Sequence, residues 1–412
     1  MKNTRRLGYV PGLLAVSACM GLTGPETEDG ATTTPAERTA ATAMPVQAAS
    51  GPHAPAGVNP FAGSHFYVDP QFQERVAQMA AQDPEHRAHI EDVANNPTGL
   101  WLDSIASLAG MAGHLDAAPA KEQATGEPVV PVFVVYNLPN RDCSASSSAG
   151  ELTRENDGEA RYRSEFIDVI AAELAARASQ RVVVILEPDS LPNVATNLDV
   201  PKCAASAELY KSSIAYAISK LSLPNVFVYL DAAHAGWLGW DGNRARIAAI
   251  FREVLNAAGG VDRIRGFATN VSNYNPLTGE DGLRLEPSTP TPNELSYVQK
   301  LSASLAAAGI RDKGFIIDTS RNGKAGIRSS WGNWCNIEGA ALGEPPRVAP
   351  APLVDAYFWV KPPGDSDGTS DASAARFDPS CRSEDSAPDA PEAGRWFPSY
   401  FLELVQNAKG AG

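Results

Sequence analysis

Three aspartates stand shortly after short apolar runs, at positions where carboxyl groups could do chemistry: Asp142, Asp189 and Asp367. Carboxyl groups that converge in a partly desolvated cleft cannot all stay ionised, because like charges raise one another's pKa. One of them can then act as a general acid, while an ionised neighbour acts as a base or stabilises positive charge. The nearby Arg141 and Lys361 could hold chosen carboxylates in the charged form. A lone aspartate at such a position often caps a helix or satisfies a loop, but three of them with flanking cations favour acid–base catalysis.

Four tryptophans lie at or just beyond the ends of apolar runs, namely Trp101, Trp237, Trp240 and Trp334. A flat indole face can stack on the apolar face of a pyranose ring, while the sugar hydroxyls reach polar groups nearby. Any one of these side chains could instead pack in the core or against a loop. Together they favour a carbohydrate substrate.

Short apolar, β-branched runs that end in a polar residue recur seven times, at residues 100–102, 129–136, 182–186, 226–230, 267–269, 315–317 and 357–360. Helical spacing of apolar residues occurs between them, in segments 161–178, 205–221, 244–257 and 293–308. Apolar strands that alternate with helices predict an α/β fold with a parallel sheet buried on both sides. Closing this sheet gives a barrel with its active site at the C-terminal strand ends, where the polar residues stand. An open doubly wound sheet is the alternative, but no glycine-rich phosphate-binding fingerprint follows the first strand, which disfavours a nucleotide-binding version.

The start of the chain has the features of an export signal, because residues 7–18 are apolar and follow three cations, Lys2, Arg5 and Arg6. The sequence of residues 16–19, Val-Ser-Ala-Cys, is similar to the bacterial lipobox, in which the cysteine becomes the lipidated first residue of the mature protein. We therefore expect a signal peptide of the lipoprotein type over residues 1–18 and lipidation of Cys19. An ordinary cleaved signal with a chance cysteine is the alternative.

Residues 20–58 are dominated by Thr, Ala, Pro and Gly and contain almost no large apolar side chain. Such a stretch cannot bury enough surface to offset the entropy of ordering it, which predicts a disordered tether. A catalytic domain over residues 59–412 should follow.

Composition narrows the class of protein. The 412 residues include 34 Lys and Arg against 48 Asp and Glu, a formal net charge of −14, which argues against a nucleic-acid partner. Hydrophobic residues make up 43% of the chain, so wholesale disorder is excluded, and no apolar run reaches the ~18–20 residues of a spanning helix. If Cys19 carries lipid, four of the five cysteines remain, with three possible pairings, and their spacing lacks the close pairs of a zinc site. We predict no metal and no cofactor.

The chain resembles glycoside hydrolase family 6, the cellobiohydrolases and endoglucanases that break down cellulose. The resemblance covers about residues 59–408. Its two most specific segments are 135–150, which contains Pro-Asn-Arg-Asp-Cys at 139–143, and 185–191, which reads Ile-Leu-Glu-Pro-Asp-Ser-Leu. Supporting matches lie at residues 230–240, 268–274, 331–335 and 359–362.

The resemblance implies a distorted barrel with about seven parallel strands and a role for each of the three carboxyl groups. Asp189 would be the general acid, Asp142 would tune its proton and stabilise the transition state, and Asp367 matches the carboxylate proposed as base. Base action could instead pass through water held near Ser148 and Asp142. The family inverts anomeric configuration, so acid and base should stand roughly 6.5–9.5 Å apart. Further substrate-binding positions implied by the family are Trp101, Asp103, Tyr136, Ser148, Asp231, His234, Trp237, Trp240, Asn270, Trp334, Lys361 and Asp365.

The resemblance also implies disulfides between Cys143 and Cys203 and between Cys335 and Cys381, which leaves Cys19 for the lipid. One position departs from the family, because Asp365 stands where a glutamate is usual. Loss of one methylene shortens its reach to sugar hydroxyls, and we expect altered affinity rather than lost chemistry.

The loops that follow Asp142 and Asp367 are long, as in the tunnel-forming members of the family. This favours a cellobiohydrolase that releases cellobiose from the non-reducing ends of cellulose. An endo-β-1,4-glucanase with an open cleft is the runner-up; a non-catalytic cellulose-binding surface lipoprotein and a hydrolase of another β-glucan are further alternatives. We expect an exported monomer that binds cellulose or cello-oligosaccharides and is attached to a bacterial membrane only through its lipid.

Overall fold

The computed structural model describes residues 53–55, 57–279, 291–330 and 332–408. The expected signal peptide, the lipidation site Cys19 and nearly all of the tether over residues 20–58 lie outside the described residues. Among the described residues, no helix has the length and apolar character needed to cross a membrane.

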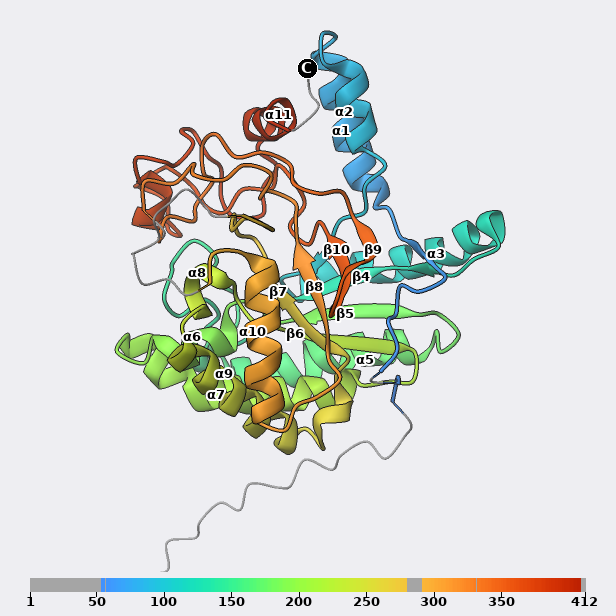
Figure 1. The fold of residues 1–412 in the computed structure, drawn as a ribbon, viewed down its shortest axis with the longest axis vertical. Helices are drawn as coiled ribbons and strands as arrows, with labels where there is room; N and C mark the ends of the chain where they lie inside the picture. The colour runs from blue at the N-terminus through green and yellow to red at the C-terminus, as the bar shows by residue number, and fades with distance from the viewer. Residues whose placement is uncertain (1–52, 56, 280–290, 331, 409–412) are drawn as a thin grey trace, which may run out of the picture. The chain divides into compact units, whose positions relative to one another are not determined.

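A curved eight-stranded sheet forms the centre of the fold (Figure 1), with the strand order β2-β4-β5-β6-β7-β8-β10-β9. The seven strands from β2 to β10 in this order are parallel, which confirms the predicted sheet of seven parallel strands. Their bounds are β2 Leu100–Leu102, β4 Val132–Val135, β5 Val182–Leu186, β6 Val226–Asp231, β7 Gly266–Thr269, β8 Gly314–Asp318 and β10 Val354–Phe358. The sequence did not predict the eighth strand, β9 Arg347–Ala351, which runs antiparallel to β10 and contains a proline.

The predicted run 129–136 is divided between two sheets at Pro131. β3 Val129–Val130 pairs in parallel with β1 His65–Phe66, while β4 continues the main sheet. The segments next to β2 and β10 approach each other without forming a full ladder. Thr98 and Trp359 make an isolated parallel bridge, and the Gly99 amide donates to the Trp359 carbonyl over 3.0 Å. The sheet is therefore a distorted, incompletely hydrogen-bonded barrel.

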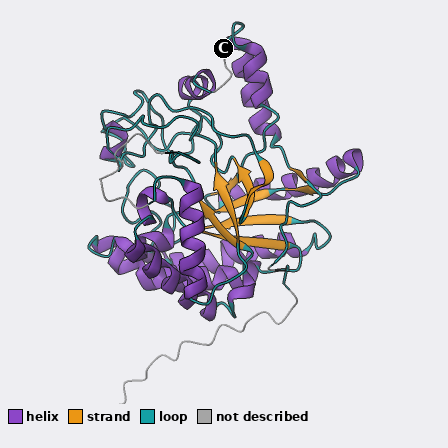
Figure 2. Ribbon diagram, in the orientation of Figure 1, coloured by secondary structure: helices purple, strands orange, loops and turns teal. Residues whose placement is uncertain are grey.

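Helices cover the outer face of the sheet (Figure 2). The predicted segments correspond to α7 Pro201–Leu221, α9 Asp241–Ala257 and α10 Glu294–Ala307, and segment 161–178 is built from α4 Gly158–Arg161, a π-helical turn Tyr162–Ile167 and α5 Asp168–Ala175. The remaining α-helices are α1 Pro70–Gln82, α2 Arg87–Val93, α3 Met111–Thr125, α6 Ser190–Thr196, α8 Ala235–Leu238 and α11 Pro398–Gln406. Short 3₁₀ turns lie at Ala106–Gly110, Arg154–Asn156, Val261–Arg263 and Pro379–Arg382.

Strand β5 illustrates why continuous apolar runs form this sheet. All five of its residues are buried. Val182 and Val184 belong to the apolar cluster beneath the helices, whereas Val183 and Ile185 belong to a second cluster inside the barrel. Because successive side chains of a strand point to opposite faces, burial on both faces requires an apolar residue at every position.

A third apolar cluster lies between α1, α2, α11 and the loops that follow β8 and β10, and it includes Phe72, Val76, Trp359, Phe401 and Leu404. These loops gather at one end of the sheet (Figure 1, orange to red). The cluster anchors long segments that have little regular secondary structure, and the same segments supply part of the cavity described next.

Candidate active site

A cavity of about 350 Å³, here called cavity 1, lies at the C-terminal ends of the parallel strands. The structure places Asp142, Asp189 and Asp367 together around it. They come from the segments after β4, β5 and β10. These residues are up to 225 positions apart in the chain, and they line the same cavity because their strands are parallel and end at the same edge of the sheet. Other lining residues include Tyr136, Ser148, Asn193, His234, Trp237, Ser272, Trp334 and Lys361.

Asp189 occupies a strained turn at the start of α6. Its φ of 64° is in the left-handed region, where non-glycine residues are uncommon, and its amide donates to Oδ2 of Asp231 over 3.0 Å. Burial raises the pKa of Asp189 to about 8, and the nearby Asp231 and Asp367 add to this shift, while Lys361 opposes it. Asp189 therefore carries a proton at neutral pH, as a general acid requires.

Asp142 lines cavity 1 together with Asp189. Burial raises the pKa of Asp142 to about 7, with a further contribution from Asp189, whereas Lys202 and Arg141 lower it. Arg141 organises the same loop, because its guanidinium donates to the carbonyls of Ser148 and Asp103 over 2.7 and 2.8 Å. Asp142 thus sits in a fixed loop and is poised to gain or lose a proton near neutral pH.

Glu187 joins the loops of Asp142 and Asp189, a role that no pattern in the sequence indicated. It is fully buried, and its two carboxyl oxygens accept hydrogen bonds from the amides of Asn137 and Leu138 over 3.3 and 3.1 Å. The hydroxyl of Tyr162, from the π-helical turn, donates to Glu187 over 2.8 Å. Burial raises the pKa of Glu187 to about 7.

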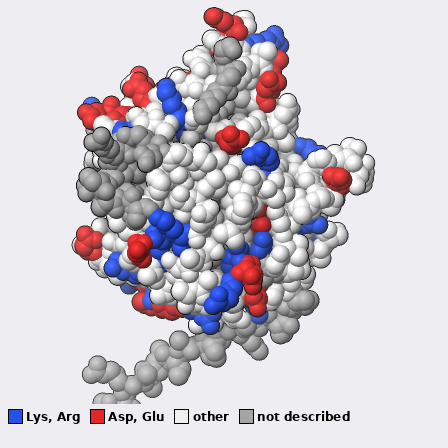
Figure 3. Space-filling model, viewed as in Figure 1, with Lys and Arg blue, Asp and Glu red and all other residues white. Residues whose placement is uncertain are grey.

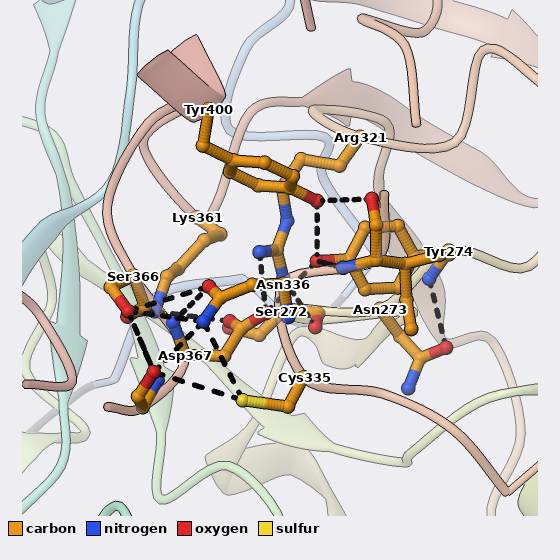
Figure 4. Close-up of polar contacts among 12 residues, drawn as sticks. Ser272, Asn273, Tyr274, Arg321, Cys335, Asn336, Lys361, Ser366, Asp367 and Tyr400 are labelled. Atoms are coloured by element: carbon orange, nitrogen blue, oxygen red, sulfur yellow. Dashed lines mark hydrogen bonds and ion pairs between the residues drawn. The ribbon is translucent and has the colours of Figure 1, made fainter. Parts of the chain in front are cut away.

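Asp367 is surrounded by hydrogen-bond donors (Figure 4). Oδ2 accepts from Arg321 over 2.8 Å, from the Tyr274 hydroxyl over 2.9 Å and from the Asn336 amide over 2.9 Å, while Oδ1 lies 3.5 Å from Nζ of Lys361. Burial by itself would raise the pKa of Asp367, but Arg321, Lys361 and the hydrogen bonds outweigh it and hold the pKa below its usual value. Asp367 is therefore a stable anion and a weak proton acceptor.

Arg321, Tyr274 and Asn336 were absent from the residues predicted from the sequence. Arg321 follows the end of β8 by three residues, so the strand-end pattern that identified the aspartates could have identified it too. No sequence signal indicated that Asn336 would reach Asp367, since that contact depends on the path of an irregular loop.

A second cavity of about 350 Å³, here called cavity 2, lies next to cavity 1. It shares Trp101, Tyr136, Ser148 and Lys361 with cavity 1, so the two cavities form one elongated groove. The rings of Trp101 and Tyr136 meet edge to face with centroids 5.4 Å apart. The predicted residues Asp103 and Asp365 line cavity 2, and a groove of this kind suits an extended chain of sugar units.

Three predicted substrate-binding residues stand apart from this lining. Asp231 and Asn270 are buried and are not among the described residues that line either cavity, and Trp240 is outside both linings as well. Asp231 instead accepts from the amides of Asp189 and Ala233, and Asn270 donates to the Asp318 carbonyl over 2.9 Å. Burial and hydrogen bonding make Asp231 and Asn270 supports of the lining, and their contact with glucose units stays a prediction.

His234 lines cavity 1 as a neutral imidazole. Its Nδ1 and Nε2 lie 2.8 and 3.0 Å from the amide groups of Asn275 and Asn273. Burial, followed by the charge of Arg328, lowers the pKa of His234 to about 3. His234 therefore does not carry charge at neutral pH.

Two disulfides, Cys143–Cys203 and Cys335–Cys381, confirm the expected pairing. The first is adjacent to Asp142, and the second joins the Asn336 segment to the loop that follows Asp367. No group of three or more His, Cys, Asp or Glu side chains within the described residues is arranged to hold a metal ion. On the face drawn in Figure 3, acidic and basic side chains are interspersed, without one large basic patch.

The model of the family described as glycosyl hydrolases family 6 matches residues 61–408. Exoglucanase 3 of Agaricus bisporus is 40% identical over 356 residues, which cover 86% of this chain and 80% of that protein. The 1,4-beta-D-glucan cellobiohydrolase CEL6C of Podospora anserina is 42% identical over 341 residues, which cover 81% of this chain and 83% of that protein.

Solved structures agree with these sequence relationships. CcCel6C, a glycoside hydrolase family 6 enzyme from Coprinopsis cinerea, is 41% identical and superposes with a TM-score of 0.80, covering 85% of this chain and 98% of that one. Cellobiohydrolase II (Cel6A) from Humicola insolens, in complex with glucose and cellotetraose, is 38% identical with a TM-score of 0.81, covering 85% and 99%. With the barrel, the three carboxyl groups and these similarities together, the chain is a glycoside hydrolase and belongs to glycosyl hydrolases family 6.

Proposed function

We propose that this protein hydrolyses the β-1,4-glucosidic bonds of cellulose with inversion of configuration and releases cellobiose from non-reducing ends. The observation that carries the proposal is a protonated Asp189 that shares one cavity with Asp142 and the charge-paired Asp367. The names of the relatives, which are cellobiohydrolases and an exoglucanase, and the cellotetraose bound to the Humicola insolens enzyme support the substrate.

In the proposed reaction, Asp189 donates its proton to the glycosidic oxygen while the bond from that oxygen to the anomeric carbon breaks. Water attacks the same carbon from the opposite side of the ring, which inverts its configuration. The anionic Asp367 stabilises the positive charge that develops on the sugar. The Arg141 guanidinium lies 4.1 Å from the centroid of the Tyr136 ring. Tyr136 lines the cavity where the distorted sugar would rest.

We assign the role of general base to Asp142, acting through a water molecule. Asp367 already accepts three hydrogen bonds on Oδ2 and has a lowered pKa, so it takes up a proton poorly. Asp142 has a pKa raised to about 7, and Ser148 lines the cavity beside it. A water molecule held near Ser148 can relay the proton of the attacking water to Asp142.

Contact between two long loops supports action on chain ends. The first loop (residues 142–157) and the second loop (residues 365–396) are joined where the Ser146 amide donates to Oδ2 of Asp378 over 2.8 Å. They also pack tightly at Gly368, where an added Cβ would lie 2.6 Å from Cβ of Ser147. Loops that meet in this way favour an enclosed groove over the open cleft of an endoglucanase.

Incubation of the protein with cellohexaose, followed by proton NMR, tests activity, cleavage pattern and stereochemistry together. We expect cellobiose whose newly formed reducing end appears first as the α anomer. Initial formation of the β anomer would contradict the inverting mechanism. A rapid fall in the viscosity of carboxymethylcellulose with little soluble sugar would favour the endo-acting alternative.

We further propose that the protein is exported as a monomer and carries a lipid on Cys19. The two disulfides support an oxidising compartment, and the lipobox-like residues 16–19 support the lipid. A bacterial host fed labelled palmitate should label the wild-type protein but not the Cys19→Ala variant. Label that persists in the variant would exclude this site, and light scattering of the purified protein would test the monomer.

A further inference from the structure

Arg75 of α1 reaches into cavity 2 and contacts Asp365. Its Nη1 lies 3.0 Å from Oδ1 of Asp365, and both residues line the cavity. The Asp365 side chain is only 13% exposed, and that of Arg75 is 32% exposed. The pair is therefore shielded from bulk solvent more than an ordinary surface ion pair, for which the net effect is small.

Neighbouring groups fix the geometry of this pair. The Arg75 guanidinium lies 5.4 Å from the ring centroid of Trp396, and the backbones of Asp365 and Trp396 form an isolated antiparallel bridge. Gly364 has a φ of 93°, and an added Cβ there would lie 2.6 Å from the Trp396 ring. Trp396 also meets Phe72 of α1 edge to face at 6.4 Å, so α1 and the second loop hold the two charges in register.

The contact with Arg75 leaves Asp365 able to bind substrate. A carboxylate offers about four acceptor positions on its two oxygens, and the hydrogen bond from Arg75 occupies one of them. The aspartate side chain is one methylene shorter than that of a glutamate, so its orientation limits which hydroxyl groups it can reach. A guanidinium that holds Oδ1 restricts the directions in which the remaining acceptor positions point.

We propose that Arg75 is a positioning residue for substrate binding, which keeps the Asp365 carboxylate directed into cavity 2 to accept hydrogen bonds from glucosyl hydroxyl groups. The inference rests on the proposed function and identifies a specificity element at the part of the groove beyond Trp101. Arg75 acts through Asp365 and takes no part in proton transfer, since the three catalytic carboxyl groups line cavity 1.

The test compares Arg75→Met, Arg75→Lys, Asp365→Asn and the double variant Arg75→Met/Asp365→Asn on cellotriose through cellohexaose. We expect Arg75→Met to raise KM roughly tenfold on the longer substrates, as for loss of one hydrogen bond involving a charged group, with kcat within about twofold. Arg75→Lys should recover part of the affinity, because an ammonium still attracts the carboxylate. The double variant should be no worse than Asp365→Asn alone, since Arg75 acts through Asp365.

A matched control is Arg87→Met on α2, which removes a mostly exposed ion pair with Glu91 and should leave KM unchanged. An unchanged KM for Arg75→Met, or effects of Arg75→Met and Asp365→Asn that add fully in the double variant, would overturn the inference. The thermal transition of Arg75→Met shows whether this variant folds. If it does not fold, the same comparison is made with Arg75→Lys. An unchanged KM of Arg75→Lys on all substrates, together with unchanged substrate binding by Asp365→Asn, would then overturn the inference. Absence of cellobiose release by the wild-type protein would instead refute the proposed function.

Discussion

Arg321 donates a hydrogen bond to Oδ2 of Asp367 over 2.8 Å, with the two side chains 0% and 5% exposed. The Arg321 guanidinium also lies 4.5 Å from the ring centroid of Tyr274, whose hydroxyl donates to the same oxygen. Burial of an ion pair costs desolvation free energy, and removal of one partner leaves the other as an uncompensated buried charge. This contact therefore decides whether Asp367 can remain an anion beside the reacting sugar.

Replacement of Arg321 by methionine should be strongly destabilising. The change leaves Asp367 as a buried charge without its main partner, for which a loss of about 3–5 kcal/mol in the free energy of unfolding is typical. Denaturant unfolding measures this loss, and kcat on cellohexaose should fall with it. Arg161→Met, which removes the partly exposed pair with Glu165, serves as the control and should cost less than about 1 kcal/mol; equal losses for the two variants would refute the argument.

Asp189→Asn should abolish proton donation while preserving the shape of the side chain. General acid catalysis contributes roughly 10²–10⁴-fold, so kcat on cellohexaose should fall by this factor. A cellobioside with an activated aryl leaving group needs no protonation and should lose far less. Asp199→Asn, at an exposed position nearby in the chain, is the control. An equal loss on both substrates would exclude Asp189 as the acid.

Stability should depend on pH through the same group. The pKa of Asp189 is about 8 in the folded protein, whereas an aspartate in the unfolded chain titrates near about 3.9. Between these pH values the folded state binds more protons than the unfolded state, so the stability contributed by Asp189 is present below about pH 4 and is lost as the pH rises through about 8. Asp189→Asn should therefore gain stability relative to wild type between pH 5 and pH 8, as measured by urea unfolding. A stability difference between Asp189→Asn and wild type that stays constant over this pH range would contradict the raised pKa.

Separation of the two loops should shift the cleavage pattern. Asp378→Ala removes the acceptor for the Ser146 amide, so the first and second loops should part more often. One hydrogen bond typically contributes about 1 kcal/mol. Its loss should make the fall in carboxymethylcellulose viscosity per reducing end released roughly two- to fivefold larger than for the wild-type protein. Asp371→Ala, which removes a local contact with Ser373 in the same loop, should leave the pattern unchanged. An unaltered pattern in both variants would mean that this contact does not close the groove.

Removal of the Cys143–Cys203 disulfide should loosen the loop that carries Asp142. The bridged residues are 60 positions apart, and loss of such a constraint costs about 2–5 kcal/mol. The double variant Cys143→Ser/Cys203→Ser should therefore unfold at lower denaturant concentration and show a lower kcat. Comparison with wild type under reducing conditions checks that the effect comes from the covalent bond, and a variant as stable as the oxidised wild type would disprove it.

Local sequence patterns determined much of the fold. Runs such as 182–186 are apolar at every position, as expected for a strand buried on both faces, and the helical spacing between such runs predicted the parallel barrel. Position within the chain also identified Asp142, Asp189 and Asp367, because polar residues that end parallel strands must meet at one edge of the sheet. β9 escaped prediction, since a short edge strand with a proline resembles a loop in sequence.

The tertiary structure alone decided which charge each carboxyl group carries. Asp189 and Asp367 are the same residue type at similar positions, yet burial beside Asp231 leaves one protonated, while Arg321, Tyr274 and Asn336 keep the other ionised. These partners lie between 31 and 93 residues from Asp367 in the chain. Sequence fixes the identity of an acidic group, but its pKa depends on the charges, donors and solvent that folding brings around it.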